Sequence, residues 1–191
     1  MYAGTSMSTR SSSRTRLAAL VAATVLCTAS GAQEKAPDAP FVPTPVPVVE
    51  RMLALAKVSR DDVVFDLGSG DGRMVIAAAQ RYGARGVGVE INPVWVLYAQ
   101  RDAAQAGVTD RVTFRIEDLF TVDLRDATVV TLYLLPWMNR KLAPRFHAEL
   151  RPGTRIVSHM YGIGDWPPDH TEQMIVDGMR HVIHVWTVRA R

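Results

Sequence analysis

A glycine-rich turn between an apolar strand and a helix constrains the fold of this chain more than any other feature. The run Val63-Val64-Phe65 is short and wholly apolar, as in strands that are buried on both faces of a parallel sheet. Asp66-Leu-Gly-Ser-Gly-Asp-Gly72 follows it directly. The spacing of apolar residues from Arg73 to Tyr82 then indicates a helix. The chain is therefore predicted to pass from a buried parallel strand through a tight turn into a helix.

The alternation of strands and helices continues along the chain. Asn92 as N-cap, Pro93 in the first turn and Gly107 beyond the end mark a further helix. We expect an α/β fold with a doubly wound, mostly parallel, seven-stranded sheet that ends in an antiparallel C-terminal hairpin around Asp177-Gly178. The expected strands are 63–65, 86–91, 112–116, 127–134, 154–158, 173–176 and 181–188, and the expected helices are 48–56, 73–82, 93–106 and 136–150.

The first 32 residues differ in composition from the rest of the chain. Three arginines without any acidic residue precede an apolar run over 17–26, and Ser30-Gly31-Ala32 follows. This pattern predicts a signal peptide over residues 1–32, with an uncleaved hydrophobic anchor as the alternative. Residues 33–47, rich in Pro and Ala, are predicted to be a linker that is neither helix nor central strand, and 48–191 the functional domain. We therefore expect an exported protein, periplasmic or secreted, or a membrane-anchored one. Membrane contact is expected only if the segment is uncleaved.

Charge and cysteine content exclude several classes of function. The three N-terminal arginines account for the net charge of +3, so residues 33–191 carry 19 basic and 19 acidic residues. Such a balance predicts no nucleic-acid partner. The only cysteine, Cys27, lies inside the predicted signal peptide. The domain is therefore expected to have no thiolate nucleophile, no disulfide and no metal site.

The glycine spacing and the acids around it indicate the kind of ligand. Gly68, Gly70 and Gly72 follow the first strand, where a doubly wound sheet binds its ligands. On the glycines alone, a tight connection without a ligand explains the turn equally well. A dinucleotide site has the spacing G-x-G-x-x-G, and a phosphate loop has a following Lys-Ser or Lys-Thr. Asp66 and Asp71 would repel a pyrophosphate but suit a ligand with an ammonium and a sulfonium group. A nicotinamide-dependent reductase is disfavoured for the same reasons.

Two further acids end the next two strands. Glu90 closes the second strand, where a carboxylate can accept both hydroxyls of a ribose. Asp118 follows the third strand and is placed to accept from an adenine amino group. Each acid alone could be a strand-end cap or a solvated charge. Acids at three successive strand ends, together with the glycines, favour an adenosine-containing cation.

At this point the sequence resembles the class I S-adenosylmethionine-dependent methyltransferases, whose fold is Rossmann-like, over nearly all of residues 43–191. In that family, the position of Asp66 and its glycines binds the methionine part of the cofactor, that of Glu90 the ribose and that of Asp118 the adenine. The resemblance implies S-adenosyl-L-methionine as the cofactor. The implied cofactor-binding residues are Thr44, Asp66, Gly68, Ser69, Gly70, Asp71, Gly72, Glu90 and Asp118.

A narrower resemblance concerns the methyl acceptor. Pro43-Thr44-Pro45, Leu134-Leu135-Pro136 and Val157-Ser158-His159, with the glycine-rich motif, look like the small protein-lysine methyltransferases. The mitochondrial members of that group modify the ATP synthase c subunit and the adenine nucleotide translocase. The chain departs from them at Val46-Pro47, where polar residues are expected. The resemblance implies a protein lysine as acceptor and a protein as partner.

The acceptor is expected at the ends of the fourth and fifth strands. Transfer from a sulfonium is an in-line displacement, so the enzyme mainly positions donor and acceptor and needs no catalytic base. Aromatic residues gather there in the sequence, namely Tyr133, Trp137, Tyr161 and Trp166. The acceptor-channel candidates are Tyr133, Pro136, Trp137 and His159, although packing explains each of them as well. A small-molecule methyltransferase and an exported non-enzymatic binding module remain the alternatives.

Overall fold

Residues 40–190 are described by a computed structural model. The predicted signal peptide and residues 33–39 of the predicted linker lie outside this range. Among the helices of residues 40–190, none is long and apolar enough to cross a membrane.

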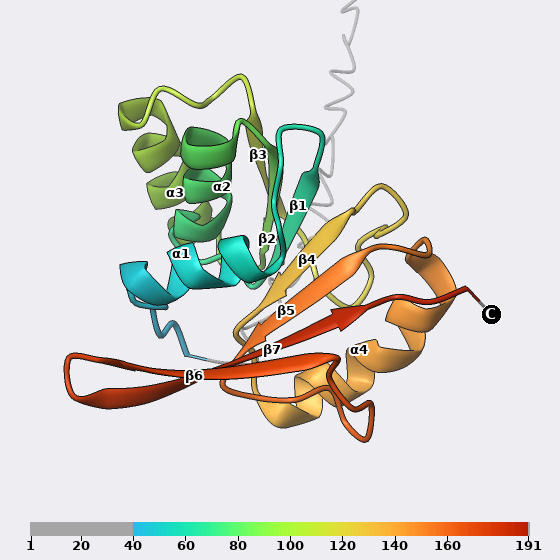
Figure 1. Cartoon of the computed structure of the whole chain (residues 1–191). Helices are drawn as coiled ribbons and strands as arrows, with labels where there is room; N and C mark the ends of the chain where they lie inside the picture. Colours follow the sequence, from blue (N-terminus) through green and yellow to red (C-terminus); the bar gives the residue numbers. More distant parts are fainter. Residues whose placement is uncertain (1–39, 191) are drawn as a thin grey trace, which may run out of the picture. The chain divides into compact units, whose positions relative to one another are not determined.

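The described residues form a seven-stranded sheet with helices on both faces (Figure 1). The strand order is β3-β2-β1-β4-β5-β7-β6, in which β3, β2, β1, β4 and β5 are parallel and β7 is antiparallel to both of its neighbours. The predicted fold class is therefore confirmed, including the C-terminal hairpin. The elements are α1 (Val46–Leu55), β1 (Val63–Leu67), α2 (Arg73–Tyr82), β2 (Arg85–Glu90), α3 (Pro93–Gln105), β3 (Val112–Ile116), β4 (Val129–Leu132), α4 (Pro136–Glu149), β5 (Arg155–His159), β6 (His170–Val176) and β7 (Met179–Thr187).

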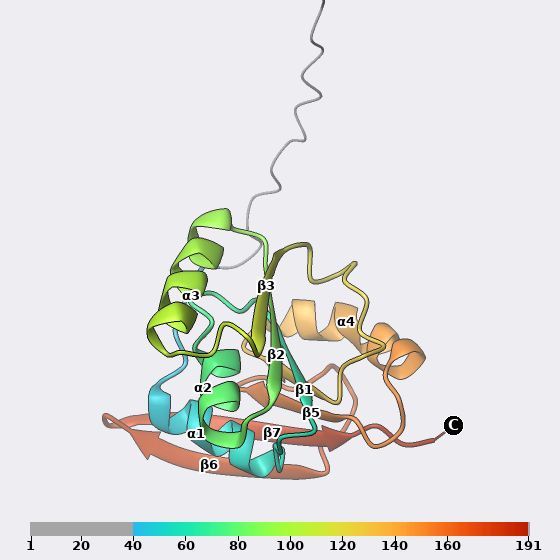
Figure 2. The ribbon, with the colours of Figure 1, turned by 90° about the horizontal axis from the view of Figure 1, so that it is seen from above.

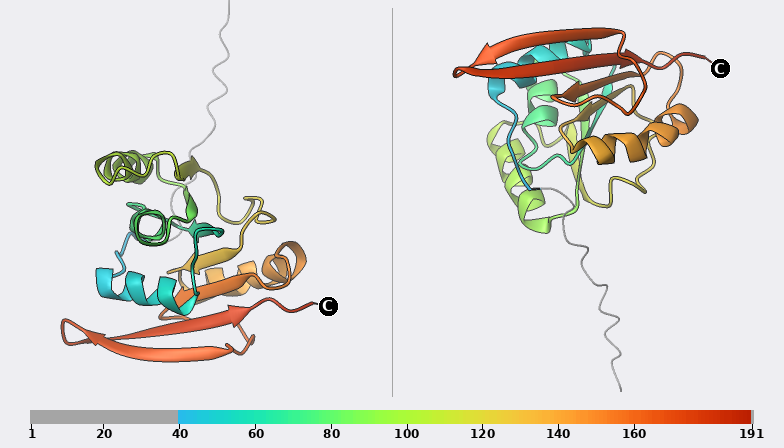
Figure 3. Two further views of the ribbon diagram at one scale, coloured as in Figure 1. Left: turned by 45° about the horizontal axis from the view of Figure 1, so that its top comes forward. Right: turned by 90° about the horizontal axis from the view of Figure 1, so that it is seen from below.

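The order of the strands in the sheet reverses next to β1. The chain first builds outward from β1 through β2 to β3 and then returns to place β4 on the other side of β1. Helices α1, α2 and α3 lie on one face of the sheet and α4 on the other (Figures 2 and 3). The connection between β3 and β4 contains no helix and contributes buried Val122 and Leu124 to the α4 face. The crevice for a ligand is expected between the ends of β1 and β4.

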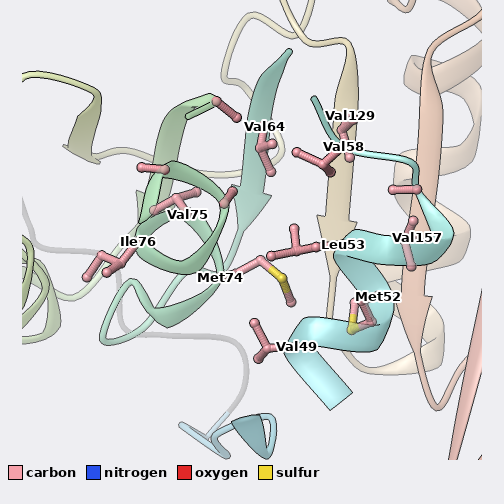
Figure 4. Packing of buried hydrophobic residues seen from close by; sticks show 14 of the residues in the cluster. Val49, Met52, Leu53, Val58, Val64, Met74, Val75, Ile76, Val129 and Val157 are labelled. Atoms are coloured by element: carbon pink, nitrogen blue, oxygen red, sulfur yellow. The ribbon is translucent and has the colours of Figure 1, made fainter. Parts of the chain in front are cut away.

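Both faces of the central strands are buried, which explains their apolar sequences. Successive side chains of a strand point to opposite faces of the sheet. Val64 and Val129 pack against α1 and α2 (Figure 4), whereas Phe65 and Val130 pack on the α4 side. All four side chains are at most 2% exposed.

The first helix corrects the prediction for residues 33–47. The helix α1 begins at Val46, so Pro47 lies in its first turn and the prediction that this stretch cannot be helical is wrong. A proline is tolerated there because the first N–H groups of a helix have no partner within it. Other differences concern strand length: β4 is shorter than the predicted 127–134, and β6 begins at His170 rather than at residue 173.

A polar network closes the end of the sheet that lies opposite the glycine-rich turn. Asp62 precedes β1 and accepts hydrogen bonds from the Thr128 hydroxyl at 2.7 Å and from Arg155 Nη2 at 2.8 Å. Burial raises the pKa of Asp62, but the hydrogen bonds from Arg155, Thr128 and Ser59 outweigh burial and lower it. The network joins the starts of β1, β4 and β5, so its role is stability rather than chemistry.

We expect Asp62→Asn to lower the free energy of unfolding by about 1 to 2 kcal/mol at pH 7, because a hydrogen-bonded charge pair is lost. The folded pKa of Asp62 lies below its ordinary value, so its stabilisation is complete above that value and disappears as the pH falls. The difference between the two proteins should therefore shrink toward pH 3, as measured by urea denaturation. Asp123→Asn is the matched control, because Asp123 pairs with Arg125 in solvent. An equal loss in both variants would contradict the prediction.

Candidate active site

A pocket lies at the carboxyl ends of β1, β2, β3 and β4, beside the point where the order of the strands reverses. Its lining residues fall within five segments, 40–44, 66–74, 90–95, 117–119 and 132–138. Four of these segments follow or end parallel strands, and the fifth is the segment before α1. Residues 40–44, predicted to belong to a linker, therefore form one wall of the pocket.

The glycine-rich turn has a backbone that only glycine adopts readily. Gly68, Gly70 and Gly72 have φ values of 81°, 51° and 77°. The amides of Gly68 and Ser69 donate to the Val89 carbonyl, which holds the turn against the end of β2. A Cβ on Gly70 would lie 2.3 Å from the ring of Phe41, so the turn and the segment before α1 pack closely.

Glu90 joins the glycine-rich turn to the start of α3. One carboxylate oxygen, Oε2, accepts from the Gly70 amide at 3.0 Å, and the other, Oε1, accepts from the Asn92 amide at 2.9 Å. Asn92 itself caps α3 by accepting from the Val94 amide, as predicted. Both Glu90 and Asn92 line the pocket. The end of β2 therefore presents a carboxylate whose position is fixed by backbone groups on both sides.

Asp66 places a buried carboxyl group in the pocket wall. The residue is 8% exposed, and the Thr131 hydroxyl of β4 donates to its Oδ1 at 2.7 Å. The pKa of Asp66 is raised to about 7, mainly by burial and also by the nearby charges of Asp71 and Glu90, while the hydrogen bond from Thr131 opposes the rise. A carboxyl group in this environment is strongly favoured to ionise when a cation enters the pocket. This supports the predicted cationic ligand.

Arg73 is a partner of Asp71 that the sequence analysis did not name. Arg73 Nε donates to Asp71 Oδ1 at 2.9 Å, and Arg73 Nη1 donates to the Thr44 carbonyl at 2.8 Å. The charge of Asp71 is thus already paired within the chain, although its side chain lines the pocket. The contact of Asp71 with the cofactor stays a prediction, with Arg73 as a further partner of the same carboxylate. Sequence reasoning missed Arg73, whose signal was its position two residues after Asp71.

Asp118 lies in the pocket wall after β3, beside Glu117 and Leu119. Its Oδ1 accepts from the Phe120 amide at 2.9 Å, which shapes the loop that follows. The structure therefore places Asp118 with Asp66 and Glu90 around one pocket, as the sequence predicted. It also shows the capping role that the sequence left open.

The acceptor-channel candidates occupy different places. Tyr133 lines the pocket, and its ring centroid lies 4.1 Å from that of His159. His159 is fully buried beneath it and is not part of the lining. Pro136 and Trp137 also lie outside the lining, and Trp137, 43% exposed, packs beside Phe120.

The two aromatic residues after β5 also differ from each other. Tyr161 is 37% exposed. Trp166 packs against the core on the α4 side, where its carbonyl accepts from Trp186 Nε1 at 3.0 Å. The expectation that Trp166 lies at the mouth of the pocket is wrong, because the loop that carries it packs on the α4 side of the sheet.

Three apolar residues and one aromatic pair complete the pocket, and none of them was among the predicted site residues. Leu132, Leu134 and Met138 form an apolar wall beside Tyr133. Phe41 and Trp95 stack with ring centroids 3.8 Å apart, and both line the pocket. The stacking of Phe41 on Trp95 joins segments that are distant in sequence, so no local pattern could reveal it.

Comparison with known proteins identifies relatives of the chain. The sequence profile described as the ANTKMT methyltransferase domain matches residues 66–170. A protein named protein-lysine N-methyltransferase from Saccharolobus islandicus is 43% identical over 80% of this chain and 95% of that protein. The lysine N-methyltransferase of the ATP synthase c subunit from Mus musculus is 38% identical over 69% of this chain. The chain spans 53% of the length of that mouse protein.

A solved structure supports the same relationship. A protein from Salinibacter ruber, described as an RNA methyltransferase in complex with S-adenosyl-L-homocysteine, is 52% identical and superimposes with a TM-score of 0.74. The match covers 78% of this chain and 95% of that one. Together with the acids and glycines around the pocket, these similarities decide the family. The chain belongs to the ANTKMT methyltransferase domain family and is an S-adenosylmethionine-dependent methyltransferase.

Proposed function

We propose that the chain transfers a methyl group from S-adenosylmethionine to the ε-amino group of a lysine in a protein. The observation that carries this proposal is the similarity to the archaeal protein-lysine N-methyltransferase, which extends over 95% of that protein. One mouse relative is named for a lysine in the c subunit of ATP synthase, and a further mouse relative for one in the adenine nucleotide translocase. The naming of relatives with different protein substrates supports the class of acceptor rather than one protein.

The residues around the pocket suit the cofactor. S-adenosylmethionine supplies a methyl group on a sulfonium, a good leaving group, so the chain has only to align donor and acceptor. Asp66 would hold the cationic methionine end, Glu90 the ribose hydroxyls and Asp118 the adenine. The turn from Gly68 to Gly72 would let the cofactor approach the backbone closely.

The apolar side of the pocket suits a lysine acceptor. A lysine must lose its proton before it attacks, which costs about 4 to 5 kcal/mol at pH 7 from a reference pKa near 10.4. Leu132, Leu134 and Met138 form a wall that would disfavour the charged form. The local environment has this effect on Tyr133, whose pKa is raised by burial and by Tyr161. Desolvation by this wall would thus favour a lysine that has released its proton to water before it enters the pocket, so that no catalytic base is needed.

RNA is the competing acceptor, because the Salinibacter ruber relative is described as an RNA methyltransferase. The balance of 19 basic and 19 acidic residues after residue 32 favours the protein acceptor over RNA.

The pKa of Asp66 predicts how cofactor affinity depends on pH. The ionised carboxylate binds the cation, so lowering the pH from 8 to 6 through its pKa of about 7 should weaken S-adenosylmethionine binding about tenfold. Asp66→Asn should bind more weakly than the native chain at pH 8 and lose this dependence. Calorimetric titration measures both, and affinity that does not change with pH in the native chain would contradict the assignment.

The same carboxyl group should destabilise the protein without its cofactor. The folded pKa of Asp66 lies above its ordinary value of about 3.9, so folding stability falls as the pH rises from that value to about 7. Asp66→Asn should therefore raise the melting temperature of the cofactor-free protein at pH 8 and change it little at pH 4. Thr131→Val should have the opposite effect and lower the melting temperature at pH 8, because it removes a hydrogen bond that favours the carboxylate.

The acceptor is identified by the chemical form of the transferred label. The full chain is incubated with S-adenosylmethionine that carries a labelled methyl group and, separately, with protein, RNA and small-molecule fractions of a cell extract. We expect label in protein, released as Nε-methyllysine by acid hydrolysis, and its loss when the lysines are first blocked by reductive methylation. Asp66→Ala with Glu90→Ala is the inactive control. Label in the RNA or small-molecule fraction alone would overturn the lysine assignment and leave the cofactor assignment intact.

We also propose that residues 1–32 direct export, with a retained hydrophobic anchor as the alternative. The basic start and the apolar run over 17–26 support this proposal. Fusion of residues 1–40 to alkaline phosphatase should give active phosphatase outside the cytoplasm, and a second fusion with Leu20→Asp and Val25→Asp should not. An inactive first fusion would contradict export.

A further inference from the structure

Two buried histidines form a hydrogen-bonded chain that ends at the pocket. His159 ends β5 and His181 lies on the neighbouring strand β7; they are 0% and 7% exposed. His159 Nε2 lies 2.9 Å from His181 Nδ1, and His159 Nδ1 lies 3.2 Å from the Thr44 hydroxyl. Thr44 lines the pocket, and its carbonyl is held by Arg73. The position of the Thr44 side chain is thus set from β5 and β7.

The imidazole nitrogen of His181 that has no partner determines which atoms are the donors in these hydrogen bonds. Among the described residues, the buried Nε2 of His181 has no hydrogen-bond partner. If His159 donated to His181, a neutral His181 would carry its proton on that Nε2 and leave a buried N–H unsatisfied. If His181 Nδ1–H donates to His159, only a lone pair is left there. A buried N–H without an acceptor is the rarer and costlier arrangement, so the donors run from His181 to His159 to Thr44.

This direction leaves the Thr44 hydroxyl as a donor to the pocket. His159 then carries its proton on Nδ1 and donates to the Thr44 oxygen, so the hydroxyl proton is available for a ligand. Removal of a proton from a ligand in the pocket would instead require His159 to accept that proton, which would give its imidazole a positive charge. Burial, together with the neighbouring His181, lowers the pKa of His159 to about 4, which opposes that charge at neutral pH. The pair therefore orients a hydroxyl group rather than removing a proton.

The carboxylate of the cofactor is the ligand group that requires such a donor. The pocket is rich in acids, and the guanidinium among its lining residues, that of Arg73, already pairs with Asp71 and the Thr44 carbonyl. We propose that His159 and His181 are positioning residues that hold the Thr44 hydroxyl as a hydrogen-bond donor to the methionine carboxylate of S-adenosylmethionine. The proposal rests on the cofactor assignment and does not depend on whether the acceptor is a lysine.

Ligands with and without the carboxylate test this proposal. Calorimetric titration of the full chain uses S-adenosylhomocysteine and 5′-methylthioadenosine, which lacks the amino-acid part. Thr44→Val and His159→Phe should each weaken S-adenosylhomocysteine binding about tenfold, as for the loss of one hydrogen bond to a charged group. The affinity for 5′-methylthioadenosine should change less than about twofold, because this ligand lacks the amino-acid part and the rest of the site is intact. Thr44→Ser, which keeps the hydroxyl, should bind both ligands as the native chain does.

Two controls separate positioning from a structural role. The double variant Thr44→Val with His159→Phe should be no weaker than either single variant, because both remove the same interaction. Equal losses for both ligands, or native affinity for S-adenosylhomocysteine in Thr44→Val, would overturn the proposal. If His159→Phe fails to fold, Thr44→Val tests the hydroxyl and the tautomer of His159 in the native chain tests the role of the histidines. A native chain that binds neither ligand would instead overturn the cofactor assignment.

The tautomers give a readout that does not depend on ligand affinity. Long-range ¹⁵N–¹H spectra of the imidazoles in the native full chain should show the His159 proton on Nδ1. A proton on Nε2 of His159 would reverse the chain of donors and contradict the proposal.

Discussion

Asp66 is the penultimate residue of β1, beside the point where the order of the strands reverses, and its carboxyl group lies in the pocket wall with a hydrogen bond from Thr131 of β4. Within residues 40–190 no ion pair joins it to a basic side chain, and the neighbouring charges of Asp71 and Glu90 are of the same sign. The fold therefore places a carboxyl group whose ionised form is disfavoured near the ends of β1 and β4. We propose that the cationic cofactor satisfies this carboxylate, so that affinity is obtained at some cost in stability.

Arg73 and the histidine pair connect this centre to the segment before α1. Arg73 pairs with Asp71 on the glycine-rich turn and holds the Thr44 carbonyl, while His159 holds the Thr44 hydroxyl. Phe41, in the same segment, packs over Gly70 and stacks on Trp95 of α3. A stretch of prolines without regular structure is thus fixed at several points. It becomes a wall of the pocket because the glycine-rich turn, β5 and α3 all contact it.

Much of the fold and of the cofactor site could be predicted because the signals are local. The helix α3 followed from Asn92, Pro93 and Gly107, and the hairpin from Asp177-Gly178, since caps and turns depend on a few adjacent residues. Acids at strand ends share one edge of a parallel sheet, which brought Asp66, Glu90 and Asp118 together. Pro47 misled the prediction because a proline at the start of a helix and one in a linker look alike in sequence.

The sequence by itself determined the fold class and the three strand-end acids, because each depends on spacing along the chain, and its resemblance to a known family implied the cofactor. The tertiary structure decided which polar groups satisfy one another. Only the packing of distant segments shows that Arg73 holds the Thr44 carbonyl, that Trp166 belongs to the core and that His159 contacts the Thr44 hydroxyl. Hydrogen bonds act over about 3 Å, so residues such as His159 and Thr44, 115 positions apart in sequence, acquire a shared role only when the sheet brings them into contact.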